Sequence, residues 1–164
     1  MSGYSGKTHS FKMWTLLCCH SMAFEHPADD VIREILAHPR RIAVVGCSPD
    51  SRRDSYRVAR LLIEHGHDVI PVNPRAGEIL GRRCYPSLRD VPGPVEMVDV
   101  FRRSEHVAQI VEEAIEKGAK IVWTQLGVGD DRAGERARRA GLTVVMDRCP
   151  AIEYRRLFPT NASS

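Results

Sequence analysis

The sequence of 164 residues lacks the features of several whole classes of protein. No stretch approaches the ~18 consecutive apolar residues of a membrane-spanning helix. Glycine and proline, with 12 and 10 residues, are too few for a collagen-like or low-complexity chain. Aromatic residues make up only 6% of the chain, whereas surfaces that bind nucleic acid place aromatic residues among clustered basic ones. We therefore expect neither a membrane nor a nucleic acid as a partner.

Lysine is also scarce, because 20 of the 24 basic residues are arginine and only four are lysine. Arginine binds phosphates and carboxylates through a planar pair of donors, so this excess favours an anionic ligand. A coding bias toward arginine is the alternative. The positions of the arginines along the chain decide between the two.

Cysteine occurs five times, an odd number, and no pair has the CxxC spacing of a redox or zinc site. This usage indicates reduced thiols and a cytoplasmic location. The apolar stretch within residues 12–24 is short, is interrupted by His20 and lacks a small-residue cleavage site, so it does not fit a signal peptide. We interpret residues 1–21 as an N-terminal extension, disordered or not native, since Met22 is an alternative start. Residues 22–160 are then one domain and residues 161–164 a tail.

From residue 41 onward, short β-branched apolar runs alternate with amphipathic segments. The runs predict five strands, at 42–45, 69–72, 95–101, 121–123 and 143–146. The amphipathic segments predict helices at 28–38, 56–65, 104–117 and 131–140, with Ser104 as an N-cap and a short further helix at 87–91. Gly66, Gly118 and Gly141 follow three of these helices, where a left-handed residue ends a helix. We expect a single α/β domain with three α/β/α layers, in which a Rossmann-like, doubly wound sheet has five parallel strands.

Ligands of such sheets bind beyond the carboxyl ends of the strands. The loop after the first predicted strand, residues 46–55, begins with Gly46, which lets the backbone approach a ligand. Ser48 and Ser55 offer hydroxyl groups, and the amides at the start of the next helix favour an anion. Only the first glycine of the GxGxxG dinucleotide pattern is present, so this loop is not a dinucleotide fingerprint.

The loop after the second strand reads Val72-Asn73-Pro74-Arg75. Domains that bind NAD usually place an acidic residue there to hold the ribose. Asn73 can bind a ribose or a base, and Arg75 suits a phosphate, so this loop favours a phosphorylated ribose. The alternative is that Asn73 and Pro74 simply form a turn and Arg75 is solvated.

The third and fourth strands also end in residues that suit a nucleotide. Phe101 could cover an adenine face, while Arg102 or Arg103 could pair with a phosphate. Alternatively, Phe101 belongs to the core and both arginines are solvated. The fourth loop contains Gly127 at the same edge of the sheet.

The segments RIAVVGCSPDSRRDSYRV, VIPVNPRAG, VDVFRR, VWTQLGV and VMDRCPAIE, in this order, resemble the small stand-alone CoA-binding proteins of bacteria and archaea. Their domain is similar to the CoA-binding N-terminal domain of the succinyl-CoA synthetase alpha subunit. The resemblance covers roughly residues 33–154. It implies a Rossmann-like fold that holds coenzyme A by its adenosine phosphate end.

Carried over position by position, the resemblance adds residues to those that the strand ends indicate. Gln125 matches the fourth loop of the family. The candidate residues for binding CoA are Gly46, Cys47, Ser48, Arg53, Ser55, Asn73, Pro74, Arg75, Val100, Phe101, Arg102, Leu126 and Gly127.

Nothing in the sequence predicts catalysis. His65 and His67 flank a helix-ending glycine, where we expect them to be solvated, and no histidine has a base or carboxylate partner in a catalytic pattern. We interpret Asp130 and Asp131 as a helix cap and not as a metal site. The leading hypothesis is a non-catalytic sensor, carrier or partner module that binds CoA or acyl-CoA, either as a homodimer or with an acyl-CoA enzyme. The alternatives are an NAD(P)-binding oxidoreductase or redox sensor, and a detached CoA-binding subunit of an acyl-CoA ligase.

Two cysteines lie where they could approach a ligand. Cys47 is in the first loop and Cys149 follows the fifth strand. A thiol of low pKa there could form a mixed disulfide with CoA. The alternative is that both are small packing residues.

Overall fold

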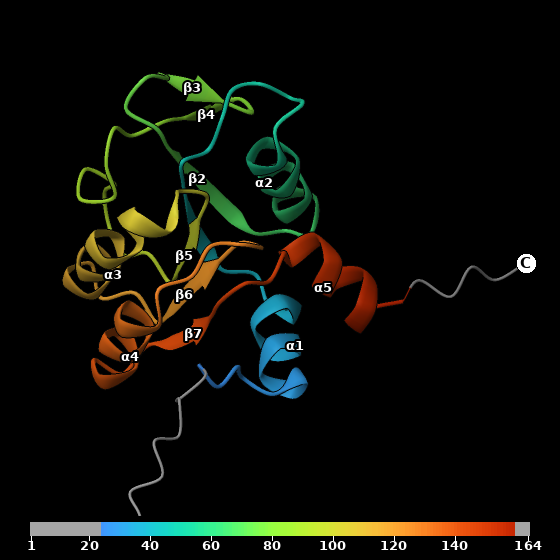
Figure 1. Ribbon diagram of the computed structural model, residues 1–164. Helices are drawn as coiled ribbons and strands as arrows, with labels where there is room; N and C mark the ends of the chain where they lie inside the picture. Colours follow the sequence, from blue (N-terminus) through green and yellow to red (C-terminus); the bar gives the residue numbers. More distant parts are fainter. Residues whose placement is uncertain (1–23, 160–164) are drawn as a thin grey trace, which may run out of the picture.

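The computed structural model describes residues 24–159 (Figure 1). The expected extension at residues 1–21 and the tail at residues 161–164 lie outside this range. Within it, no helix is both long and apolar enough to cross a membrane.

The centre of the molecule is a parallel sheet of five strands in the order β2-β1-β5-β6-β7. Each strand is short and apolar and is buried between helices, which is typical of a parallel sheet. The prediction of five parallel strands is confirmed. The strands are β1 (Arg41–Val45), β2 (Asp68–Val72), β5 (Met97–Val100), β6 (Ile121–Thr124) and β7 (Thr143–Val145).

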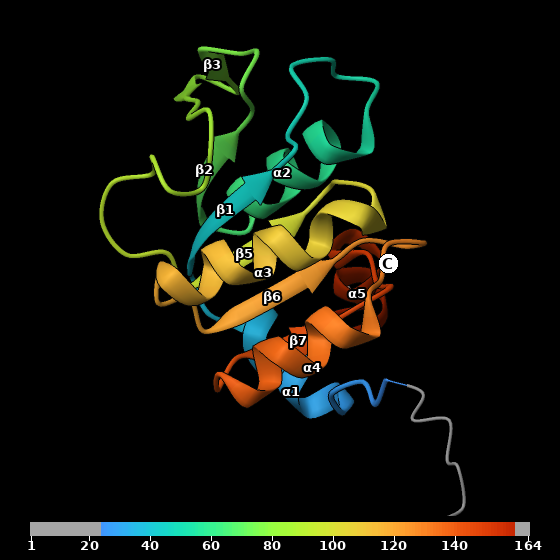
Figure 2. The ribbon, with the colours of Figure 1, turned by 60° about the vertical axis from the view of Figure 1, so that its left-hand side comes forward.

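Helices cover both faces of this sheet, so the fold is the expected three-layer, Rossmann-like arrangement (Figures 1 and 2). Neighbouring residues of β1 show the reason: Ile42 and Val44 pack toward one set of helices, and Ala43 packs toward the other. One set is α1 (Asp29–Ala37), α2 (Asp54–Glu64) and α5 (Pro150–Leu157). The other is α3 (Val107–Glu116), preceded by the 3-10 turn η1 (Ser104–His106), and α4 (Asp131–Arg139).

The predicted helix ends are largely confirmed. Gly66, Gly118 and Gly141 all have positive φ angles, of 87°, 73° and 89°. The prediction that Ser104 caps a helix is wrong, because its hydroxyl accepts a hydrogen bond from the Gly129 amide at 3.1 Å. Ser104 therefore joins the loop after β5 to the loop after β6.

Residues 75–94 differ most from expectation. They contain a small antiparallel hairpin of β3 (Glu78–Ile79) and β4 (Arg82–Arg83), which the sequence analysis did not predict. The predicted helix at 87–91 is wrong: the Asp90 and Val91 amides only form turns, onto Ser87 and Leu88. Pro92 restricts the residue before it to extended backbone, so a segment this short cannot complete a second helical turn.

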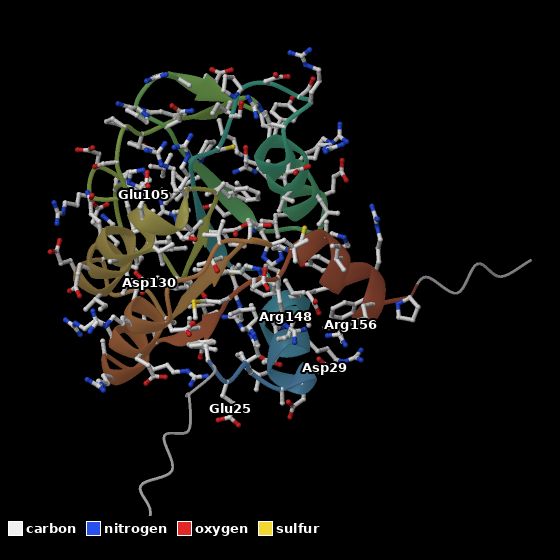
Figure 3. The ribbon with its side chains drawn as sticks, viewed as in Figure 1. Glu25, Asp29, Glu105, Asp130, Arg148 and Arg156 are labelled. Atoms are coloured by element: carbon white, nitrogen blue, oxygen red, sulfur yellow. The ribbon has the colours of Figure 1, made fainter. Side chains whose placement is uncertain are left out.

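Helix α5 was also missed, although Pro150 at its first turn is a common helix start. It packs on α1 beside the amino ends of the strands. Figure 3 shows Arg156 of α5 facing Asp29 of α1, and their two pairs of atoms lie 2.5 and 2.6 Å apart. Arg156 also binds Glu153 at 2.6 Å. Through its hydrogen bonds to Asp29, Arg156 holds the pKa of Asp29 below its ordinary value.

A buried histidine joins α1, β2 and α5 at the same edge. The Arg40 amide donates to Nδ1 of His67 at 3.1 Å, so Nε2 carries the proton and donates to the Tyr154 hydroxyl at 2.6 Å. That hydroxyl in turn donates to the Leu36 carbonyl at 2.8 Å. The expectation of a solvated His67 is therefore wrong, because its side chain is 3% exposed. The expectation holds for His65, which is exposed and stacks on the ring of Tyr154.

Candidate functional site

The order of the strands reverses between β1 and β5, which are hydrogen-bonded neighbours, and this is where ligands of doubly wound sheets bind. Gly46 follows β1 at this point, with a φ of +88°. A Cβ atom on Gly46 would lie 2.5 Å from the Phe101 carbonyl oxygen and 2.9 Å from Cδ of Arg102. Only glycine fits between the two strand ends, because the Phe101 carbonyl and the Arg102 side chain fill the space that a Cβ atom would take.

The first two predicted loops are joined by one side chain. The Asn73 amide nitrogen donates to the Cys47 carbonyl at 2.7 Å, and its oxygen accepts from the Arg75 amide at 2.8 Å. Asn73 thus positions the two loops relative to each other. The turn that the sequence analysis kept as an alternative is present at Pro74 and Arg75. The side chain of Arg75 is exposed and makes no hydrogen bond or ion pair with the described residues.

The two serines of the first loop also serve its conformation. Ser55 is buried and its hydroxyl accepts from the Ser48 amide at 3.0 Å. The Ser48 hydroxyl accepts from the Asp50 amide at 3.1 Å. Figures 1 and 2 show this loop and the β3–β4 hairpin at the same end of the molecule. Together they form the wall beyond the carboxyl ends of β1 and β2.

Two candidate side chains belong to the core. Cys47 and Val100 are both 0% exposed, so only their backbone atoms could contact a ligand. Burial raises the pKa of the Cys47 thiol to about 12, and the neighbouring Cys84 and Asp99 raise it further in the same direction. Cys149, by contrast, is only partly buried and lines a cavity. The structure therefore favours the packing interpretation for Cys47.

Two hollows flank the crevice at Gly46. A small cavity of about 140 Å³ lies on the α3 side, and Gly46, Val72, Pro74 and Ile110 are among its lining residues. A larger groove of about 910 Å³ runs along α2 on the other side of the sheet. Arg102 lines both, so the two hollows meet at this residue.

Of the other candidates, Phe101, Leu126 and Gly127 line the larger groove. Arg53 is exposed in the first loop but lines neither hollow. The structure thus brings most of the candidates to one edge. The sequence analysis missed the face of α2 that forms the wall of the groove, because the spacing of Val58 and Leu61 is also that of ordinary core residues.

A buried carboxyl group lies beneath the groove. Asp99 of β5 is 0% exposed, and its Oδ1 accepts a hydrogen bond of 2.6 Å from Nε2 of Gln125. Its other oxygen, Oδ2, has no partner among the described residues. Burial raises the pKa of Asp99 to about 7, while the hydrogen bonds from Gln125 and from the Val100 amide oppose the increase. The sequence signal was an aspartate inside an otherwise apolar strand.

Within residues 24–159, no group of three or more His, Cys, Asp or Glu side chains could hold a metal ion. Asp130 accepts a hydrogen bond from the Ala133 amide at 3.0 Å, and Figure 3 shows it at the start of α4. The interpretation of Asp130 as a helix cap is therefore confirmed.

A doubly wound sheet with a glycine crevice at the reversal of strand order is the framework of a nucleotide-binding α/β domain. The comparison with known families is more specific: residues 40–155 match the model of the CoA binding domain. The chain belongs to this family.

Three relatives describe the range of the family. The uncharacterized protein YneT of Bacillus subtilis is 39% identical over 130 residues, which cover 79% of this chain and 96% of YneT. A solved structure of a hypothetical protein from Pyrococcus horikoshii OT3 is 46% identical and superposes with a TM-score of 0.77, covering 80% of this chain and 92% of that one. The alpha subunit of ADP-forming acetate–CoA ligase II from Pyrococcus furiosus is 36% identical over 104 residues. Those residues are 62% of this chain but only 22% of that subunit, so the similarity is to one part of it.

Proposed function

We propose that this protein binds coenzyme A by its adenosine phosphate end at the carboxyl edge of the sheet. The observation that carries this proposal is the Gly46 crevice, which lies at the reversal of strand order within the part of the chain that matches the CoA binding domain. The diphosphate would lie beside Gly46, which lines the small cavity together with Arg102. The amides at the start of α2 would face the same anion.

The small cavity suits the adenine ring. Its walls include the apolar side chains of Val72, Leu88 and Ile110, and Pro74 lies at its edge. Flat apolar walls with a few polar groups are usual for such rings. Arg75 follows Pro74 directly and has no acidic partner among the described residues, so it is placed to meet the 3′-phosphate that distinguishes CoA from dephospho-CoA.

Calorimetric titration of the dialysed protein with CoA, dephospho-CoA and NAD⁺ tests this proposal. We expect binding of CoA, weaker binding of dephospho-CoA and no heat with NAD⁺. Binding of NAD⁺ without CoA would instead support the oxidoreductase or redox-sensor alternative. If none of the three binds, the proposed ligand is wrong.

We further propose that binding, and not catalysis, is the role of this chain. No candidate side chain has the base or acid partner that a nucleophile needs, and the groups around the crevice serve to position loops or to meet an anion. The similarity to one part of a ligase subunit favours a second candidate, the detached CoA-binding component of an acyl-CoA ligase. Affinity purification from native cells separates the two, because only a ligase component would recover a partner with the remaining ligase domains.

A further inference from the structure

The larger groove is a hollow beside the crevice that is separate from the small cavity. It follows one face of α2 over most of the helix, and α5 lies beside α2 on the same face of the sheet (Figure 1). Its volume of about 910 Å³ is at the upper end of the range for small-molecule sites. The groove begins at the crevice, because Arg102 lines both hollows.

The walls of the groove are mainly apolar. Its apolar lining includes Val58 and Leu61 of α2, Ala151 of α5, and Phe101 and Leu126 from the loops after β5 and β6. Leu126 is 57% exposed, so it leaves apolar area at the mouth of the groove for a ligand to cover. The chemistry of the walls therefore suits a hydrocarbon segment.

Polar groups are arranged at one side of this apolar channel. Gln125 lines the groove, and its amide nitrogen is held by the buried Asp99 at 2.6 Å. Asp99 therefore turns the carboxamide so that its oxygen is the group left to accept a hydrogen bond from the groove. An acceptor held in this way suits the amide N–H groups of a pantetheine arm.

Charge limits what can enter. Arg57 and Arg60 pair with Asp54 and Glu64, so both acidic residues of the lining are neutralised. Arg102, Arg103 and Arg155 also line the groove and make no ion pair with the described residues. An anionic ligand with an apolar tail matches this lining, whereas a cationic or zwitterionic one does not.

We propose that the groove receives the pantetheine arm together with an apolar acyl group, so that the preferred ligand is a CoA thioester of a fatty acid and not free CoA. This inference rests on the proposed function, because the groove is entered from the crevice that would hold the diphosphate. It goes beyond that function by naming the class of ligand and the residues that select it.

A chain-length series on the unmodified protein is the primary test. The full chain is titrated by calorimetry with CoA, acetyl-CoA, butyryl-CoA and hexanoyl-CoA. Each buried methylene strengthens binding about fourfold, so we expect hexanoyl-CoA to bind at least about tenfold more tightly than acetyl-CoA. Equal affinities across the series would overturn the inference while leaving CoA binding intact. If neither CoA nor any ester binds, the proposed function fails, and this inference with it.

Leu61→Ser tests the position of the acyl group. We expect it to lower the ratio of hexanoyl-CoA to CoA affinity toward one, because Leu61 lines the groove along α2. Ile152→Ser is the matched control: Ile152 is an exposed apolar residue of α5, 46% accessible, that does not line the groove. It should leave the ratio unchanged. Equal changes of the affinity ratio in both variants would overturn the assignment. A change of oligomeric mass in Leu61→Ser without a change of the ratio would also overturn it, and would indicate that the groove is an interface between copies of the chain.

Discussion

At the amino edge of the sheet, two buried polar side chains bond to each other and to the backbone, whereas at the carboxyl edge one buried oxygen and one exposed arginine have no partner among the described residues. His67 and Tyr154 form a closed set with the backbone of α1. Asp99, in contrast, has an oxygen without a partner among the described residues, and Arg75 has no ion pair among them.

The difference separates two uses of polar residues in one small domain. Closed sets hold elements together, because a buried group that loses its partner carries the full cost of desolvation. An unpartnered buried group such as Asp99 costs stability, whereas an exposed group such as Arg75 costs little and is accessible to a ligand. The comparison predicts that variants at the amino edge change stability without changing affinity, and that most variants at the carboxyl edge do the reverse.

We expect the largest effect from replacing Asp99. This residue is the exception at the carboxyl edge, because its replacement should change the free energy of unfolding. Its pKa in the folded protein is about 7, against 3.8 for an ordinary aspartate. The folded protein therefore keeps a proton that the unfolded chain releases near pH 4, so the stability that this proton provides is lost as the pH rises from about 4 to about 7. We therefore expect the free energy of unfolding of the unmodified protein, measured against that of Asp99→Asn at the same pH, to fall by on the order of 4 kcal/mol between about pH 4 and about pH 7.

Urea denaturation at a series of pH values measures this difference. The variant is needed because His67 acts in the opposite direction. Burial, with His65 and Arg40 nearby, lowers the pKa of His67, so its contribution is present above about pH 6.5 and is lost as the pH falls through its folded value. A difference between the two proteins that does not vary with pH would show that Asp99 is ionised in the fold.

Tyr154→Phe tests the closed set at the amino edge. It removes the hydroxyl that accepts from His67 and donates to the Leu36 carbonyl, both buried. We expect the free energy of unfolding to fall by about 2 kcal/mol, since two buried groups lose their partner. CoA affinity, measured on the same preparation, should stay the same. A loss of affinity at unchanged stability would contradict the division between the two edges.

Arg75→Ala tests the carboxyl edge alone. The lost charge-assisted bond to the 3′-phosphate should weaken CoA binding about tenfold and leave dephospho-CoA binding nearly unchanged. Stability should change by no more than about 0.5 kcal/mol, because Arg75 is exposed. Arg139→Ala, an exposed arginine of α4 on the opposite side of the sheet from the groove, is the control. Equal losses for CoA and dephospho-CoA would remove Arg75 from this role.

The smallest expected effect is a difference in reactivity between two thiols. In a variant in which Cys18 and Cys19 are serine, oxidised CoA should form an adduct with Cys149 and not with Cys47. The Cys149 thiolate attacks the disulfide, forms a mixed disulfide and releases a CoA thiolate. Cys47 does not react, because burial raises its pKa to about 12. Intact mass decides: an adduct that survives Cys149→Ser but not Cys47→Ser would reverse this order.

Much of the fold followed from local pattern. The five strands have the β-branched composition of a sheet covered on both faces, and three glycines with positive φ end the helices where expected. The errors lie where patterns are short. The hairpin of two-residue strands is shorter than any periodicity can show. Helix α5 has a weak apolar face, and it is held largely by contacts with α1 that are distant in sequence, such as Arg156 to Asp29.

The sequence predicted that the candidate residues share one edge of the sheet, and the structure places most of them there. Strand ends identified Gly46, Arg102 and Gly127. The same reasoning predicted Asn73 as a ligand-binding residue, and only the structure shows that its side chain also joins two loops. Sequence spacing shows which residues reach one edge of a sheet, but not which of them have already bonded to one another.

The sequence by itself determined the alternation of strands and helices and the family, because these depend on periodicity and on residue types along the chain. Only the tertiary structure decided that His67 and Cys47 are buried and that a long groove adjoins the crevice. Burial and pairing depend on residues far apart in the chain, and the physical state of each of these groups depends on its neighbours in space.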